Sequence, residues 1–251
     1  MDTGEFYDKI APFYDLIYPD WEASIKRQAG QLRSIIAEYG IKAGSSILDV
    51  SCGIGTQTLG LAALGFNLTA SDLSAAEVRR AQAEAKKRAL AIKLSVCDMR
   101  EVASHHREQY DVVLSGDNSV PHLLTDSDIL KAFRQFYDCT RPGGICVLTV
   151  RDYANEKIES GVIKPYAVQE RDDGRYIIFQ VWEVDGGQYV TSMYFLRDLK
   201  DGTCDSQVSR ARYYAIPVAK LMSLLEDVGF SKVKREDGVF FQPVIVGRRE
   251  G

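Results

Sequence analysis

The chain has 251 residues, a formal net charge of −4, 45% hydrophobic residues and 26% charged residues. Such a chain is long enough to bury a substantial core, and its composition is that of an ordinary globular protein. It has no clustered basic surface and no run near the ~18 apolar residues of a membrane-spanning helix, so we expect neither nucleic-acid nor membrane binding. Five cysteines and three histidines show no metal-ligand spacing, and the N-terminus lacks signal-peptide features. We therefore expect reduced thiols, no metal site and a cytoplasmic location.

The N-terminal part is rich in aromatic residues between positions 6 and 21. A helix is predicted over residues 21–39, followed by glycines at positions 40 and 44. We expect this region, residues 1–45, to cover a site formed by the rest of the chain.

Residues 47–56, Ile-Leu-Asp-Val-Ser-Cys-Gly-Ile-Gly-Thr, are the most informative segment. They read as a buried parallel strand, a glycine turn and the opening of a helix. Glycine lets the backbone bend tightly and approach a ligand closely. A strand, a glycine turn and a helix N-terminus together predict a nucleotide site at the carboxyl end of a sheet.

The type of nucleotide depends on the third position of the glycine pattern. Gly53 and Gly55 fit the dinucleotide-binding motif, but its third glycine is replaced by Thr58. That third glycine serves helix–strand packing around a pyrophosphate, so its absence disfavours NAD. An NAD-dependent oxidoreductase is therefore an alternative with less support.

A second predicted strand, residues 66–72, ends in Asp72, which lies 17 residues past Gly55. This is near the ~20 residues expected for a carboxylate that binds ribose hydroxyls. The alternative role of Asp72 is to cap the next helix. Ser74 and Glu77 already form a capping-box pattern for that helix, so we favour the ribose role.

Four further elements continue the alternation of strands and helices. A third strand, residues 92–96, leads into Asp98, and a fourth, residues 110–114, leads into Asn118. A helix with one apolar face is predicted over residues 126–139. The sequence Arg-Pro-Gly-Gly at 141–144 is expected to stop that helix before a fifth strand at 145–150.

Beyond residue 153 the pattern changes. Two β-rich runs, 176–184 and 188–197, are joined by Asp-Gly-Gly, which indicates a hairpin, and a third antiparallel strand is predicted at 206–214. A helix from Pro217 to Gly229 and strands at 230–234 and 242–248 end the chain. We expect a doubly wound α/β core at residues 46–153, an antiparallel β insert at 154–215 and a core-completing segment at 216–251.

These motifs resemble those of class I S-adenosylmethionine (SAM) methyltransferases, over roughly residues 14–248. The first motif is Asp-x-x-Cys-Gly-x-Gly at 49–55. Three further patterns are similar to glycine N-methyltransferases and related small-amine enzymes: Asn-Ser-x-x-His-Leu at 118–123, Arg-Pro-Gly-Gly at 141–144, and Arg-Asp-Tyr at 151–153. The resemblance implies a seven-stranded Rossmann-like sheet with its last strand antiparallel. It also implies SAM as cofactor, S-adenosylhomocysteine (SAH) as its product, and a small-molecule amine as acceptor.

The resemblance also assigns site residues. It implies cofactor contacts from residues at the strand ends and in the N-terminal region: Tyr14, Tyr18, Arg27, Asp49, Ser51, Gly53, Gly55, Asp72, Leu73, Asp98 and Met99. We also expect a cofactor contact from Asp117. It implies catalytic roles for Asn118 near the acceptor nitrogen, Arg151 as an anchor for a carboxylate, and Tyr213 as a cover over the acceptor. A strand-end salt bridge is the alternative for Arg151, a turn residue for Asn118, and packing of the insert for Tyr213.

Two departures bear on the acceptor. Asp117 stands where the resembling enzymes have glycine, and Asp152 where they have asparagine, and a second acid favours an amine other than glycine. Methylation of another nitrogen or oxygen nucleophile and a non-catalytic SAM-binding protein are the remaining alternatives. A homo-oligomer is compatible with the sequence.

Overall fold

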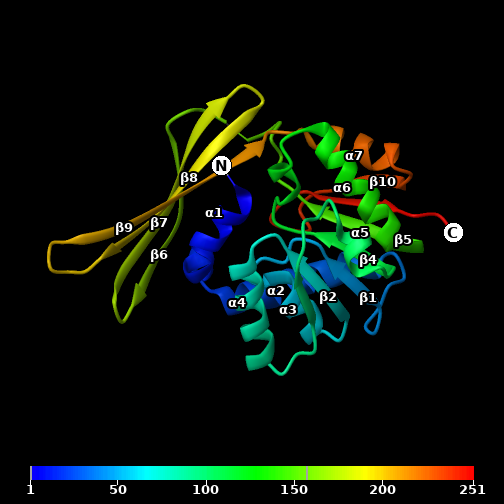
Figure 1. Cartoon of the computed structure of the whole chain (residues 1–251), viewed down its shortest axis with the longest axis horizontal. Coiled ribbons are helices and arrows are strands. Elements are labelled where there is room, and N and C mark those ends of the chain that lie inside the picture. Colours follow the sequence, from blue (N-terminus) through cyan, green and yellow to red (C-terminus); the bar gives the residue numbers. More distant parts are fainter. Residues whose placement is uncertain (1, 157) are drawn as a thin grey trace.

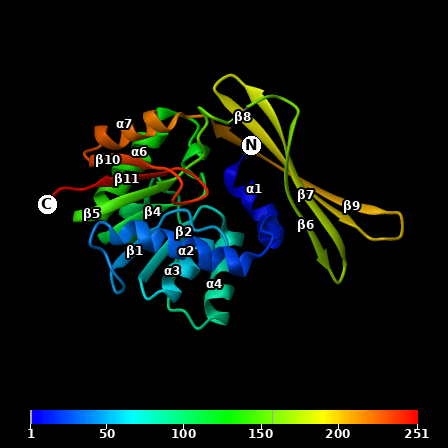
Figure 2. The same ribbon diagram turned by 180° about the vertical axis from the view of Figure 1, so that it is seen from behind.

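The computed structural model of the chain describes residues 2–156 and 158–251 and contains two β-sheets (Figures 1 and 2). Met1 and Lys157, which fall in the predicted regions 1–45 and 154–215, lie outside the described residues. The larger sheet has the order β10-β11-β5-β4-β1-β2-β3. Its strands are β1 Ser46–Asp49, β2 Asn67–Asp72, β3 Lys93–Val96, β4 Tyr110–Ser115, β5 Thr140–Thr149, β10 Ser231–Glu236 and β11 Val244–Arg248. β11 pairs antiparallel with both β10 and β5, and the other neighbouring strands are parallel, which confirms the predicted seven-stranded sheet.

Helices cover both faces of this sheet. One layer contains α2 Trp21–Ala37, α3 Thr56–Ala63 and α4 Ala75–Lys87, and the other contains α5 Val102–His106, α6 Asp126–Cys139 and α7 Val218–Asp227 (Figure 1). The side chains of successive strand residues pack against the two helix layers in turn. Ile47 packs with α2 and α3, whereas Leu48 packs with α6 and α7. Burial on both faces is the reason that the parallel strands are continuously apolar. Among the described residues, no helix combines the length and apolarity needed to cross a bilayer.

The second sheet is antiparallel and extends away from the core (Figure 1). It consists of β6 Val162–Arg171, β7 Gly174–Asp185, β8 Gln188–Asp198 and β9 Cys204–Tyr214, in that order. The predicted hairpin joins β7 to β8, with Asp185 paired to Gln188. The sequence analysis missed β6. Pro165 and the polar residues within this strand concealed it in the sequence. The strand lies at the edge of the sheet, where a proline is tolerated.

The segment Arg141–Gly144 differs from its prediction. It was expected to form a turn before a strand at 145, but β5 already begins at Thr140. Thr140 pairs with Tyr110 and Ile145 with Val112, so the intervening residues form an irregularity within the strand. A β-bulge of this kind accommodates extra residues without ending the pairing.

An N-terminal strap, residues 3–17, lies between the two sheets (Figures 1 and 2). It consists of helix α1 Thr3–Ile10 and the 3₁₀ helix η1 Ala11–Ile17, neither of which was predicted. On one side, Asp8 accepts hydrogen bonds from Ser74 and Ala76 at the start of α4. On the other side, Phe6 and Ile10 pack against the second sheet. The strap therefore connects the α/β core to the antiparallel insert.

Candidate active site

The glycine turn after β1 has a backbone that only glycine adopts easily. Gly53 and Gly55 have φ angles of +52° and +96°. A Cβ atom on Gly55 would lie 3.0 Å from Cγ of Leu59, so a side chain there would also crowd α3. Positive φ and close approach together explain both glycines.

Asp49 supports this turn from beneath. Its carboxylate accepts a hydrogen bond of 2.6 Å from the Thr58 hydroxyl and one of 3.2 Å from the Ser51 amide. Burial raises the pKa of Asp49 to about 7. Thr58 thus has a specific function where a dinucleotide-binding motif would have glycine. Asp49 and Gly55 do not line the cavity above the turn, and their predicted cofactor contacts stay predictions.

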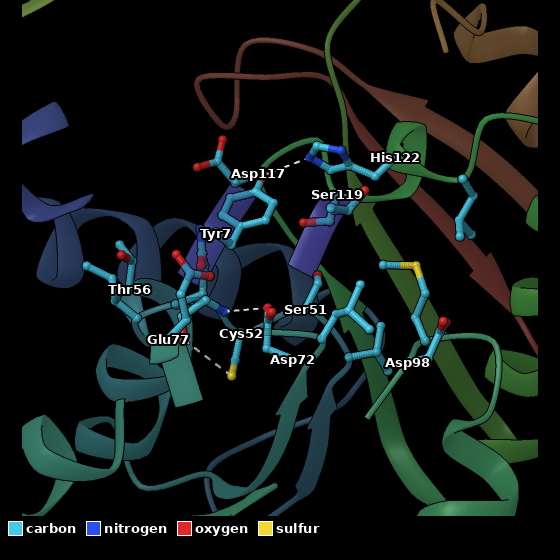
Figure 3. Close-up of a pocket in the computed structure, with 18 of the residues that line it drawn as sticks. Tyr7, Ser51, Cys52, Thr56, Asp72, Glu77, Asp98, Asp117, Ser119 and His122 are labelled. Carbon is cyan, nitrogen blue, oxygen red and sulfur yellow. Dashed lines mark hydrogen bonds between the residues drawn. The ribbon is translucent and has the colours of Figure 1, made fainter. Parts of the chain in front are cut away.

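A cofactor cavity of about 250 Å³ opens above the turn, at the carboxyl ends of the strands (Figure 3). It brings together most of the predicted cofactor residues: Tyr14, Tyr18, Ser51, Gly53, Asp72, Leu73, Asp98, Met99 and Asp117. The same cavity is lined by several residues that the sequence analysis did not assign, including Tyr7, Gln57, Glu77 and Ser119.

Two of the predicted carboxylates of this cavity, Asp72 and Asp98, are held by neighbouring hydrogen-bond donors. Asp72 accepts hydrogen bonds of 2.9 Å from the amides of Gly53 and Ser74, and burial raises its pKa. Asp98 is held by Arg100 at 2.6 Å. Burial alone would raise the pKa of Asp98, but the hydrogen bonds from Arg100 bring it below the usual value. Asp72 therefore lies beside the glycine turn, and Asp98 remains ionised at neutral pH.

Glu77 is a buried carboxyl that the sequence analysis treated only as half of a capping box. The Ser74 half forms, because Ser74 Oγ accepts from the Glu77 amide at 3.1 Å. The Glu77 half does not form, because the Ser74 amide donates to Asp72 instead. Glu77 instead lines the cofactor cavity, where its Oε1 has no hydrogen-bond partner. Burial, and secondly the negative charge of the nearby Asp72, raise the pKa of Glu77 well above the usual value.

A second cavity of about 660 Å³ adjoins the first and is called the acceptor cavity below. It contains the three predicted catalytic residues, Asn118, Arg151 and Tyr213, and also Arg27, which was expected to contact the cofactor. Among the described residues, four line both cavities: Tyr7, Tyr14, Tyr18 and Asp117. The junction of the two cavities is therefore built from three tyrosines and one carboxylate.

Arg151 follows β5 and lies on one wall of the acceptor cavity. Its guanidinium donates a 3.0 Å hydrogen bond to the Tyr166 hydroxyl and lies 5.3 Å from the centre of the Trp182 ring. Glu156 is 3.9 Å away and also pairs with Lys164. Asp117 and Asp152 also line this cavity, so the positive charge is local to Arg151 and Lys164, where it suits an anionic group.

Asn118 uses both ends of its amide within the protein. Its Nδ2 donates to the Tyr153 hydroxyl at 2.7 Å, and its Oδ1 accepts from the Arg151 amide at 2.9 Å. Asn118 therefore fixes the backbone from which Arg151 projects. Its predicted position near the acceptor nitrogen stays a prediction, as does the covering role of Tyr213.

Tyr7 joins Tyr213 to His122 across the junction. Nδ1 of His122 lies 3.2 Å from the carbonyl oxygen of Arg212, so this nitrogen carries the proton and donates it. Nε2 then accepts from the Tyr7 hydroxyl at 2.8 Å, and burial lowers the pKa of His122 to about 4. Tyr7 also lies 3.4 Å from the Tyr213 hydroxyl. His122 is thus a neutral residue with both nitrogens in use.

Comparisons with known proteins agree with this geometry. Residues 47–144 match the family model described as a methyltransferase domain. A glycine/sarcosine N-methyltransferase of Halorhodospira halochloris is 26% identical over 60% of this chain and 55% of its own length, so the chain spans about half of that relative.

Two solved structures have the same fold. The CcbJ methyltransferase of Streptomyces caelestis has a TM-score of 0.81 at 17% identity and covers 100% of both chains. SAM-bound CalS10 of Micromonospora echinaspora has a TM-score of 0.75 at 17% identity and covers 90% of this chain and 92% of its own. These proteins are named as methyltransferases, which gives the NAD alternative no support. Residues 47–144 thus match a methyltransferase domain, and the chain has the fold of known methyltransferases, in agreement with the resemblance seen in its sequence.

Proposed function

We propose that this chain transfers a methyl group from SAM to the nitrogen of a small amine that also carries an anionic group. The observation that carries the proposal is the position of Arg151, on a cationic wall of a cavity that adjoins the cofactor cavity. A planar guanidinium binds a carboxylate through two parallel hydrogen bonds, which fixes the orientation of the acceptor.

The residues of the cofactor cavity fit SAM. Asp72 offers carboxylate oxygens at the end of β2, where a ribose is expected, and Asp98 and Met99 lie after β3 for the adenine. When bound, SAM supplies an electrophilic methyl group on a positively charged sulfur. The tyrosine rings at the junction, Tyr14 and Tyr18, present electron-rich faces, which attract cations.

Catalysis by this site rests mainly on placement. Holding two reactants in the right geometry lowers a barrier by up to ~7–11 kcal/mol. Arg151 would hold the far end of the acceptor, and Asn118 would keep the Arg151 backbone in place. Catalysis by placement therefore needs one residue that anchors the acceptor, Arg151, and one that keeps the anchor in position, Asn118.

The comparisons and the cavity size bear on the acceptor. One relative is named a glycine/sarcosine N-methyltransferase, and CalS10 is described as an amino pentose methyltransferase. The acceptor cavity of about 660 Å³ is within the ~300–1,000 Å³ of pockets that hold drug-sized ligands. An acceptor larger than glycine therefore fits this chain better than glycine itself.

A mass-spectrometric screen tests the function. Purified protein and SAM are incubated with glycine, sarcosine, longer amino acids, amino sugars and matched hydroxy compounds. We expect methylation of amines that carry an anionic group. Methylation of hydroxyl compounds alone would replace this proposal with the oxygen-nucleophile alternative, and no SAM turnover on any compound would favour a non-catalytic SAM-binding protein.

Arg151→Lys tests the anchor on whichever amine is methylated. Lysine keeps the positive charge but loses the bidentate fork. We expect the KM of the amine to rise about tenfold while the affinity for SAM stays nearly unchanged, because ground-state and transition-state binding are lost equally. Normal turnover by Arg151→Lys would contradict the carboxylate anchor.

The outer face of the antiparallel sheet supports a homo-oligomer. Ile163, Val168 and Ile177 are 63%, 65% and 37% exposed, and Val168 pairs with Ile177 across the β6–β7 ladder. An exposed apolar sheet face of this kind is typical of a protein–protein interface. Light scattering of the purified protein measures its mass in solution, and a monomer at micromolar concentration would contradict the assembly.

A further inference from the structure

Asp117 has a position that no other carboxylate of the described residues shares. It follows β4 directly and lines both the cofactor cavity and the acceptor cavity. Asp72, Asp98 and Glu77 line only the first cavity, and Glu156 lines only the second. The methyl group must pass from one cavity to the other at their junction, so Asp117 is the carboxylate nearest to that passage.

The backbone holds Asp117 in a conformation that has an energetic cost. Its φ angle is +52°, in the left-handed region, where aspartate and asparagine are the best tolerated residues after glycine. The amide of Asp117 donates to Thr149 Oγ1 at 2.7 Å, and Gln242 donates to its Oδ1 at 3.2 Å. Strain that surrounding groups maintain in this way is typical of functional positions.

The chemistry of an amine acceptor requires a base near this junction. At neutral pH most amines are protonated and have no lone pair with which to attack a methyl group. The three tyrosines at the junction cannot serve, because burial raises the pKa of Tyr7, Tyr14 and Tyr18 well above the usual value. Nε2 of His122 already accepts a hydrogen bond from Tyr7. Asp117 is the remaining group at the junction that can take a proton.

We propose that Asp117 binds the ammonium group of the acceptor and removes its proton before methyl transfer. This inference rests on the proposed function. The freed nitrogen lone pair forms the new carbon–nitrogen bond while the carbon–sulfur bond breaks and its electron pair stays on sulfur. The positive charge moves from sulfur to the methylated nitrogen, and the proton on Asp117 is later released to water.

The surroundings of Asp117 support this role. Burial raises the pKa of its carboxyl, and the positive charge of Arg151 opposes that rise. A raised carboxyl pKa is closer to that of an amine, which makes proton transfer less costly. The polar and titratable groups that face Asp117 come from several elements: Tyr14 and Tyr18 of the N-terminal region, Glu77 of α4, Arg151 after β5, Tyr166 of β6 and Gln242 before β11.

A binding experiment tests the position of Asp117 without any acceptor. Sinefungin is a SAM analogue in which a carbon atom bearing a primary amine replaces the sulfonium and its methyl group. Its ammonium therefore occupies the place of the transferred methyl. We expect Asp117→Asn to lower the affinity for sinefungin about tenfold and the affinity for SAH less than about twofold, because only sinefungin loses a charge-assisted hydrogen bond.

Asparagine tolerates the left-handed backbone and keeps an oxygen for Gln242, so the variant changes mainly the charge. Asp237→Asn, which removes an exposed carboxylate near the end of β10, is the control for a change in net charge. Equal losses for sinefungin and SAH, or no loss for either, would overturn the proposal.

A kinetic experiment tests the proton transfer on an amine that the wild type methylates. We expect Asp117→Asn to lower kcat/KM by about 100-fold near neutral pH, within the range for general-base catalysis, and the deficit to shrink as rising pH deprotonates the free amine. A deficit that is constant with pH would overturn the proposal. A wild type that methylates no amine refutes the proposed function and proton removal with it, while the sinefungin result still decides whether Asp117 faces the methyl position.

Discussion

The two cavities of this molecule are built in different ways. The cofactor cavity is formed largely by short turns that directly follow β1, β2 and β3, so its shape depends on local sequence and on backbone groups. The acceptor cavity is formed by side chains from the N-terminal strap, the ends of β4 and β5, the antiparallel sheet and residues 241–243. Segments so distant in sequence can change separately. A fold of this design can therefore keep one cofactor while its acceptor varies.

Asp72 gives the sharpest test of the first cavity. We expect Asp72→Ala to weaken SAM binding by ~1–3 kcal/mol, because the ribose loses a charged acceptor and the Gly53 amide loses its partner. The KM of the acceptor at saturating SAM should change little. Titration calorimetry measures the SAM affinity.

Asp72→Asn is the matched variant, since it keeps an oxygen for the Gly53 amide. Its loss of SAM affinity should be smaller than that of the alanine variant. Unchanged SAM affinity in both variants would remove the ribose assignment and show that the turn does not depend on this carboxylate.

Tyr7 tests whether the two cavities are separable at their junction. It lines both, whereas Tyr213 lines only the acceptor cavity. Tyr7→Phe removes the hydrogen bond to His122, and we expect it to weaken the binding of SAM and of the acceptor by ~0.5–1.5 kcal/mol each. Tyr213→Phe should affect the acceptor alone. If both variants change only acceptor binding, the strap does not serve the cofactor cavity.

The buried carboxyl of Glu77 makes the free energy of unfolding depend on pH. A carboxyl whose pKa is raised by folding binds a proton more tightly in the folded state than in the unfolded state. Its contribution to stability is therefore fully present below the unfolded value of 4.5 and is lost as the pH rises through the raised folded pKa.

We expect Glu77→Gln to be more stable than the wild type at pH 8 by about 1 kcal/mol, since it removes an ionisable group with an unpartnered oxygen. The advantage should disappear at low pH. Urea denaturation of both proteins from pH 5 to pH 9 measures this difference. Glu183→Gln, which changes an exposed residue of β7, is the control, and a Glu77→Gln advantage that is independent of pH would contradict the protonation argument.

The cofactor cavity was largely predictable because its signals are local. Gly53, Asp72 and Asp98 each follow a predicted strand, and the ends of parallel strands meet at one edge of the sheet. The inward position of Glu77 was not predictable, because Asp72 accepts the hydrogen bond from the Ser74 amide that the Glu77 carboxyl would accept in a capping box. A capping-box pattern in sequence cannot show that another carboxylate accepts from the same amide.

The acceptor cavity was less predictable because its contacts join distant segments. Arg151 was found from its motif, but its partner Tyr166 lies on β6, the strand that proline and exposed polar residues concealed. Tyr7 belongs to a helix that the aromatic composition alone did not indicate. Its contacts with His122 and Tyr213 span 115 and 206 residues, a separation that periodicity does not reveal.

The N-terminal strap has a consequence for the order and strength of ligand binding. Its Tyr7 and Tyr14 line both cavities, and it is tied to α4 through Asp8 and to β6 through the ion pair of Asp15 with Arg171. Either ligand therefore holds the strap in the position that the other requires. We expect SAM and the acceptor to raise each other's affinity by the same factor, as thermodynamic linkage demands, so that the acceptor binds weakly to the protein without cofactor. The strap would then prevent an amine from occupying a site that has no methyl group to give.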